Sequence, residues 1–167
     1  MGTRRAAREC ALRILYEIEF NDAGAEAALA RESGGSVLGR ETFDYAAGLV
    51  RGVVARRDEI DQLIESISAH WRIPRMAPVD RNILRMAVYE LLEEAFLAPA
   101  IVINEAIEIA RRFSGDAAAH FVNGVLDAVR KKLAAGADET KVKKSHGSKT
   151  SAPRRPAADR SRPRTKK

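Results

Sequence analysis

The sequence predicts an all-α fold of about seven helices in two packed helical subdomains, followed by a disordered C-terminal tail. Apolar residues recur at the 3.6-residue spacing of a helix through most of the first 133 residues, and no segment alternates convincingly as a strand would. Pro78 and Pro99 each stand at the start of such a pattern, where proline suits the first helical turn. Because 46% of the residues are hydrophobic, the helices can bury a sizeable core.

The first subdomain, about residues 1–72, is expected to contain four helices. The first of them spans Thr3 to Phe20 and begins at a residue that suits the N-cap position. The others are expected over residues 23–31, 41–55 and 58–70. A flexible loop is expected at Ser33 to Ser36, which holds two glycines. Two prolines within residues 71–78 break the helical pattern and separate the two subdomains.

The second subdomain, about residues 73–135, is expected to contain three helices. They are predicted over residues 78–95, over residues 99–113, and from a turn at 114–116 to about residue 133. The last helix carries Asn123 and Gly124 on the side opposite its apolar face. A glycine inside a helix costs about 1 kcal/mol relative to alanine. We therefore expect a neighbouring helix to approach Gly124 closely, with Asn123 and Asp127 hydrogen-bonded there.

The positive charge of the chain is concentrated in its C-terminal tail, residues 136–167. The tail holds 11 Lys and Arg and 3 Asp and Glu, a net charge of +8, which leaves −2 for the remaining body. No large apolar residue follows Val142, so the tail cannot bury enough surface to offset its ordering entropy and is predicted to be disordered. Two interpretations stay open for it: non-specific attraction to phosphate backbones, or simple solubilisation. The body must bind nucleic acid, if it does so, through a local basic patch.

Several classes of protein find no support in the sequence. No run of 18 apolar residues could span a membrane, and the charged N-terminus resembles no export signal, which fits a cytoplasmic protein. A single cysteine, Cys10, allows no internal disulfide. The three histidines lack metal-ligand spacing, and neither a glycine-rich phosphate loop nor a nucleophile elbow is present. We therefore expect no metal, no cofactor and no catalytic activity.

Glu105 and Glu108 come nearest to a catalytic carboxylate pair, because they lie three residues apart on one predicted helix. Such spacing is more typical of a solvated helix face. Arg112 follows Glu108 by four residues, so these two side chains are expected to form an ion pair.

The N-terminal helix carries a candidate surface for single-stranded RNA. Arg4, Arg5 and Arg8 lie near its start, and Tyr16 follows on the same flank. Guanidinium groups bind phosphates through paired hydrogen bonds, and an exposed aromatic ring can stack on a base. The alternative is a solvated helix end with Tyr16 packed in the core.

Two further positions are candidates for binding. The connection before the last helix brings His120 and Phe121 close to a helix N-terminus, which suits a phosphate, although Phe121 also fits a core position. Asp80 lies in the first turn of its helix, where a carboxylate stabilises the helix dipole. Its position beside Arg81 also suits a protein partner.

Several segments together resemble one family, the NusB transcription antitermination factors. The matching stretches are Arg4 to Leu12 followed by Tyr16, Val79 to Leu91, Pro99, Ile103 to Ala110, and Phe121 to Asp127. They occur in the family's order and cover about residues 3–133, so that only the tail lies outside the resemblance.

The resemblance implies an all-α, non-catalytic protein that binds the boxA element of nascent ribosomal RNA jointly with NusE, a small-subunit ribosomal protein. It further implies that this assembly joins the transcription elongation complex, suppresses termination and promotes rRNA synthesis. The RNA-binding residues that it implies are Arg4, Arg5, Arg8, Tyr16, Asp116, His120 and Phe121. It also implies that Asp80, next to Arg81, faces the protein partner.

The chain departs from the family pattern before the last helix, where three alanines at 117–119 remove hydrogen-bonding side chains. Two other interpretations stay open. One is a helical protein–protein adaptor without specific RNA recognition, in a dimeric form if this chain resembles the family members that dimerise over the RNA site. The other is a fragment of an rRNA cytosine methyltransferase with a NusB-like N-terminal domain. A basic tail stands where that enzyme needs a cofactor domain, which argues against it.

Overall fold

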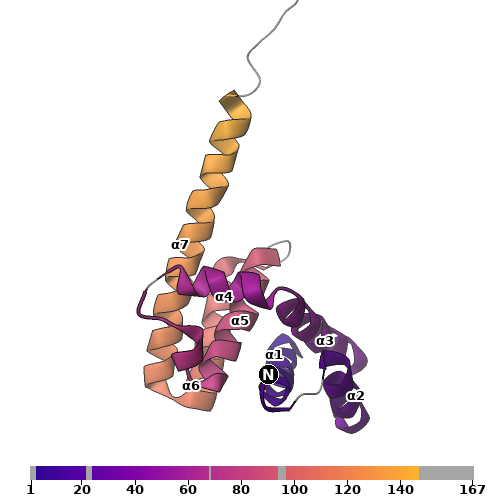
Figure 1. Cartoon of the computed structure of the whole chain (residues 1–167). Helices are drawn as coiled ribbons and strands as arrows, with labels where there is room; N and C mark the ends of the chain where they lie inside the picture. Colours follow the sequence, from indigo (N-terminus) through magenta and orange to yellow (C-terminus); the bar gives the residue numbers. More distant parts are fainter. Residues whose placement is uncertain (1–2, 22–23, 68, 94–96, 147–167) are drawn as a thin grey trace, which may run out of the picture. The chain divides into compact units, whose positions relative to one another are not determined.

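The computed structural model describes residues 3–21, 24–67, 69–93 and 97–146. Within these ranges the chain forms seven α-helices, one short 3-10 helix and no strand (Figure 1). The elements are α1 (Thr3–Phe20), α2 (Ala25–Gly35), α3 (Arg40–Ala55), α4 (Arg57–Glu65), η1 (Ile73–Arg75), α5 (Pro78–Glu93), α6 (Pro99–Ser114) and α7 (Asp116–His146). The predicted all-α fold is confirmed. None of the described helices has the length and apolar character needed to cross a membrane.

The body, Met1–Ala134, forms one compact unit, and Ala135–Lys167 forms a second. Within the body, α1 packs against α2, α3 and α5, while α5 also packs against α3, α4 and α6. All residues from Asn82 to Val88 are buried, which makes α5 the central helix of the body. Each fully buried Val, Leu or Ile side chain contributes about 1.5–3 kcal/mol. The predicted division of the body near residue 72 stays a prediction.

The close helix approach expected at Gly124 occurs elsewhere, at Gly52 of α3. A Cβ atom on Gly52 would lie 2.0 Å from Cζ of Tyr89, so the Tyr89 ring of α5 occupies the space of the missing side chain. Gly124 has nothing within 4 Å of the same position. Asp127, expected to bond at such an approach, pairs instead with cations of its own helix. The prediction for Gly124 is therefore wrong, because its side of α7 meets no neighbour among the described residues.

Helix α2 continues through the predicted loop and ends at Gly35. Glu32, in its last turns, accepts hydrogen bonds from the Arg13 guanidinium at 3.3 Å and from the Cys10 thiol at 3.6 Å. These contacts with α1 hold the end of α2 in place although its glycines disfavour a helix. The loop predicted at residues 33–36 is thus wrong up to Gly35. The helix predicted over residues 58–70 also ends earlier, at Glu65.

The last helix, α7, extends to His146, beyond its predicted end near residue 133, and the disorder predicted from Gly136 onward stays a prediction. Residues 136–146 include three lysines, and lysine is a good helix former. Extending an existing helix also avoids the cost of a new nucleus. The remainder of the predicted tail, residues 147–167, lies outside the described residues.

Candidate nucleic-acid interface

Arg8 is buried in an ion pair with Glu90, which α5 places opposite α1. The Arg8 Nη2 atom lies 2.8 Å from Glu90 Oε1, and Arg8 Nε lies 2.9 Å from Oε2. The two side chains are only 4% and 5% exposed. We expected Arg8 to present its guanidinium at the surface, and this is wrong. In this arrangement a phosphate would have to displace the Glu90 carboxylate.

Tyr45 of α3 completes this buried cluster. Its hydroxyl donates a hydrogen bond to Glu90 Oε1, the oxygen that also accepts from Arg8. Burial raises the pKa of Tyr45 to about 12, and the hydrogen bond to Glu90 acts in the same direction. The phenol therefore remains a protonated donor at neutral pH, and the cluster links α1, α3 and α5.

Arg4 and Arg5 are the more accessible arginines of α1. Arg5 Nε and Nη2 lie 2.9 Å and 2.6 Å from the two carboxylate oxygens of Glu105, and the Arg5 side chain is 34% exposed. The hydrogen bond from Arg5 lowers the pKa of Glu105. Arg4 is exposed, with its guanidinium carbon 5.0 Å from the centre of the Tyr45 ring. No carboxylate of the described residues pairs with Arg4, which leaves its charge available for a ligand.

A second cross-helix pair joins α1 to the C-terminal end of α6. Arg112 Nη1 lies 2.7 Å from Glu9 Oε1, and the Glu9 side chain is 10% exposed. Glu108 pairs with Arg111 of the same helix, and the pair expected between Glu108 and Arg112 stays a prediction. Together with the Arg5–Glu105 pair, this contact places α6 along α1. The predicted N-terminal site on α1 therefore contacts α6, the helix that leads into the turn before α7.

The turn before α7 leaves Asp116 and His120 exposed. Gly115 has φ of 96°, a left-handed conformation that favours glycine. The Asp116 carboxylate, 81% exposed, accepts a hydrogen bond from Arg111 at 3.1 Å. Phe121 is half-buried, and its ring meets the Trp71 ring edge-on with 5.7 Å between centroids. Phe121 therefore packs in the body, whereas Asp116 and His120 are open to a ligand.

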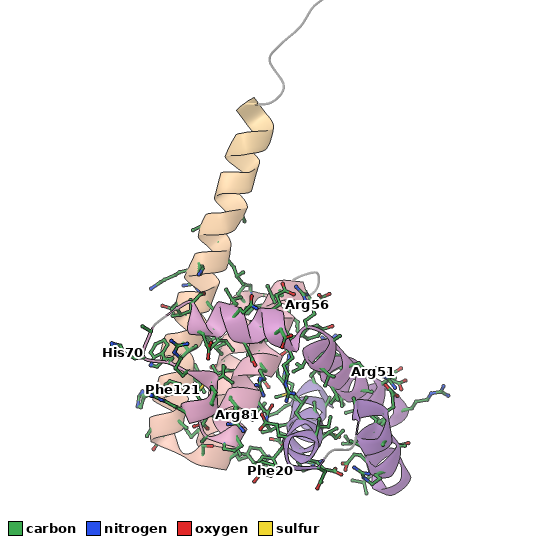
Figure 2. The ribbon with its side chains drawn as sticks, in the orientation of Figure 1. Phe20, Arg51, Arg56, His70, Arg81 and Phe121 are labelled. Carbon is green, nitrogen blue, oxygen red and sulfur yellow. The ribbon has the colours of Figure 1, made fainter. Side chains whose placement is uncertain are left out.

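The exposed face of α1 ends in an aromatic pair. Tyr16 is 43% exposed and Phe20 is 59% exposed. Phe20 lies at the C-terminal end of α1 (Figure 2). The ring centroids of Tyr16 and Phe20 lie 4.7 Å apart. The alternative in which Tyr16 is a core residue is wrong. Sequence reasoning missed Phe20, although its spacing of four residues from Tyr16 was a usable signal.

Arg81, one of the two predicted partner-binding residues, is held within the body. Its Nε atom lies 2.8 Å from Glu19 Oε1, and Nη1 donates to the Met76 carbonyl at 3.1 Å. Glu19 also binds Arg85, at 2.7 Å. Asp80 is half-buried, and its Oδ1 atom is buried without a hydrogen-bond partner among the described residues. The partner-facing role of Asp80 and Arg81 stays a prediction.

The described residues contain no group of three or more side chains placed to hold a metal ion. Cys10 is fully buried, and burial raises the pKa of its thiol to about 11. This thiol is therefore a packed core group in α1 that stays protonated at neutral pH.

Comparison with known proteins relates this geometry to one family. The NusB family profile matches residues 5–131. Transcription antitermination protein NusB of Anaeromyxobacter dehalogenans (strain 2CP-1) is 47% identical over 131 residues, covering 77% of this chain and 92% of that protein. The protein of the same name from Myxococcus xanthus (strain DK1622) is 42% identical over 135 residues, covering 77% and 95%.

Two solved structures extend the comparison. T. maritima NusB matches with a TM-score of 0.69 and 33% identity, over 77% of this chain and 90% of that chain. A chain from the crystal structure of antitermination factors NusB and NusE in complex with dsRNA also matches with a TM-score of 0.69. It is 29% identical, over 78% of this chain and 97% of that chain.

Proposed function

The chain belongs to the NusB family, and we propose that it is an RNA-binding transcription antitermination factor that acts by assembly rather than by catalysis. In this proposal it binds boxA of nascent rRNA together with NusE, joins the transcription elongation complex in the cytoplasm, and promotes rRNA transcription. The observation that carries the proposal is the exposed Arg4 guanidinium, which lies beside Arg5 and has no carboxylate partner among the described residues.

The proposed RNA contacts follow from accessibility. Arg4 binds a phosphate through paired hydrogen bonds and positions the strand. Arg5 is 34% exposed and adds its charge to this surface while Glu105 holds its Nε and Nη2 atoms. Tyr16 stacks on an unpaired base, and Asp116 and His120 contact the strand where α7 begins. Phe121 offers the RNA only the part of its ring that Trp71 leaves uncovered. Arg8 supports this surface indirectly by fixing α1 to α5 through Glu90.

NusE is proposed to bind near Asp80 in the first turn of α5. Glu19 and Arg81 join α1 to α5 at this point, with 2.8 Å between Arg81 Nε and Glu19 Oε1. The partner would therefore meet a rigid junction of two helices, with Arg81 acting through its position rather than as a free charge.

A protein–protein adaptor without RNA specificity is the second candidate function. The exposed Tyr16–Phe20 pair supports it, because exposed aromatic side chains are enriched at protein interfaces. A homodimer that uses this surface is one form of that candidate.

The two candidates differ in their response to RNA sequence. The experiment is fluorescence anisotropy with boxA RNA and a scrambled RNA of equal length, with and without NusE, over a series of salt concentrations. An antitermination factor binds boxA more tightly than the scrambled RNA at moderate salt, and NusE increases the difference. Equal affinity for both RNAs at moderate salt would instead favour the adaptor.

A further inference from the structure

A hollow of about 310 Å³ lies between the N-terminal ends of α1 and α6. Its lining residues are Arg4, Arg5, Arg8, Leu97, Ile101 and Glu105. The proposed contacts of Arg4 and Arg5 with the RNA occupy only its charged side. Leu97 and Ile101 form an apolar side that those contacts leave uncovered.

The apolar side of the hollow is open to solvent. Ile101, in the first turn of α6, is 51% exposed, while Val102 beside it is 1% exposed and packs in the core. Leu97 is half-buried and precedes the helix. The two side chains therefore present a small apolar surface next to the arginines of α1.

The charged side of the hollow is held in a fixed geometry. Glu105 binds two nitrogens of the Arg5 guanidinium at 2.9 Å and 2.6 Å, which fixes the plane of that group. The Arg4 guanidinium lies 5.0 Å from the Tyr45 ring centre, over the ring. The Arg5 guanidinium and the apolar side of the hollow thus line the same space, and the Arg4 guanidinium lies at its edge.

From this arrangement we propose that the hollow is a subsite for one unpaired nucleobase of a bound RNA strand. The base lies against Ile101 and Leu97 and meets the plane of the Arg5 guanidinium, while Arg4 binds an adjacent phosphate. Single-stranded RNA is commonly recognised through bases that are turned out of the stack and packed on aromatic rings or Arg guanidinium planes. Flipped bases also pack between apolar side chains. A nucleotide also matches both sides of the hollow. Its base supplies a flat face for the apolar side, and its phosphate supplies an anion for the charged side.

The inference rests on the proposed function. It adds a site at which the protein contacts a base, the part of the RNA that differs between sequences. Tyr45 acquires a positioning role in it, since its ring supports Arg4 at the edge of the subsite while its hydroxyl is held by Glu90. Neither Ile101 nor Tyr45 belongs to the set of RNA-binding residues expected from the sequence.

The test combines a protein variant with RNAs that each lack one base. Full-length protein with NusE is titrated into boxA RNA and into a series of boxA RNAs carrying a single abasic site at successive positions. Wild type and Ile101→Ala are compared, with Val54→Ala as the matched control, because Val54 is an exposed apolar residue that does not line this hollow. Circular dichroism verifies that each variant is folded.

We expect one abasic position to weaken wild-type binding by about 5-fold, the lower end of the range for a base–aromatic stack, because no aromatic ring of the described residues lines the hollow. Ile101→Ala should weaken binding to intact RNA, and the abasic effect at that position should shrink in this variant because both changes remove the same interaction. Val54→Ala should behave as wild type.

Unchanged affinity of Ile101→Ala for intact boxA overturns the subsite while leaving the proposed function standing. An abasic effect as large in Ile101→Ala as in wild type overturns it as well. Failure of the wild-type protein to prefer boxA at all overturns the proposed function and the subsite together.

Discussion

Arg8 and Glu90 form an ion pair that joins α1 to α5 almost without access to water, with 2.8 Å between Arg8 Nη2 and Glu90 Oε1. The Tyr45 hydroxyl binds the same carboxylate. Arg8 therefore differs from Arg4 and Arg5, although all three lie within five residues of one another in a single basic segment. The structure divides that segment into one residue that secures the helix and two that can meet a ligand.

Replacing Arg8 should destabilise the protein. Arg8→Ala leaves the Glu90 carboxylate buried without its cation, which typically costs 3–5 kcal/mol, so we expect a loss of about that size in urea unfolding followed by circular dichroism. Replacing both partners, as in Arg8→Met with Glu90→Met, should recover part of this loss because no uncompensated charge remains. Arg4→Ala, the matched control, should change the free energy of unfolding by less than about 0.5 kcal/mol. Wild-type stability of Arg8→Ala would contradict the account.

Alanine should have opposite effects at two helical glycines. Gly52→Ala places a methyl group 2.0 Å from Tyr89 Cζ, so the ring must move and the protein should lose about 1–3 kcal/mol. Gly124→Ala meets open space and should gain about 0.5–1 kcal/mol from helix propensity. Thermal and urea unfolding measure both changes. Gly52→Ala should cost little when Tyr89→Ala is already present, and a cost independent of Tyr89 would show that another neighbour is responsible.

Glu19 should contribute stability that disappears in acid. Burial alone would raise the pKa of Glu19, but hydrogen bonds from Arg81 and Arg85 outweigh burial and lower it below its ordinary value of 4.5. A carboxyl group with a lowered folded-state pKa adds stability above its unfolded pKa. That contribution disappears as the pH falls below about 4.5 and through the folded-state pKa.

Glu19→Gln should therefore lower the free energy of unfolding at pH 7 by about 1.5–3 kcal/mol. The free energy of unfolding of this variant should also fall less steeply than that of wild type as the pH decreases. Urea titrations between about pH 7 and pH 3 follow this dependence. Glu17→Gln is the control, since Glu17 is 34% exposed and its pair with Arg31 lies at the surface, where such pairs contribute little. Parallel pH curves for wild type and Glu19→Gln would refute this role for Glu19.

The helices were largely predictable because apolar periodicity reports burial directly. Val122, Val125 and Leu126 fall on the face that the pattern of α7 indicated, and all three are fully buried. Pro78 and Pro99 begin α5 and α6 as their chemistry suggested. Helix ends were less predictable: interactions of Glu32 with α1 hold the glycines of α2 in a helix, and local composition does not contain that information.

The candidate site was predictable in location but not in the role of each arginine. Arg8 and Glu90 are 82 residues apart, and Arg5 and Glu105 are 100 apart. The sequence shows these charges, whereas only the packing of α1 against α5 and α6 determines which of them are neutralised. The prediction for Gly124 failed for a related reason. The sequence shows that a glycine has no side chain, but it does not show whether a neighbour occupies the space.

The central claim is that the charges of Arg4 and Arg5 bind the RNA backbone while that of Arg8 does not. The most direct measurement is the salt dependence of boxA affinity, in the presence of NusE, for wild type and for Arg4→Ala with Arg5→Ala. Arg40→Ala with Arg51→Ala is the control, because it removes the same charge from exposed positions of α3.

We predict that the Arg4 and Arg5 double variant keeps its circular dichroism spectrum and binds boxA at least about tenfold more weakly. Its slope of log affinity against log salt should be shallower by about 0.7 for each phosphate that the variant no longer neutralises. The control pair should bind close to wild type. Affinity and slope that match the control would contradict the claim and remove the N-terminal surface of α1 as the RNA-binding site.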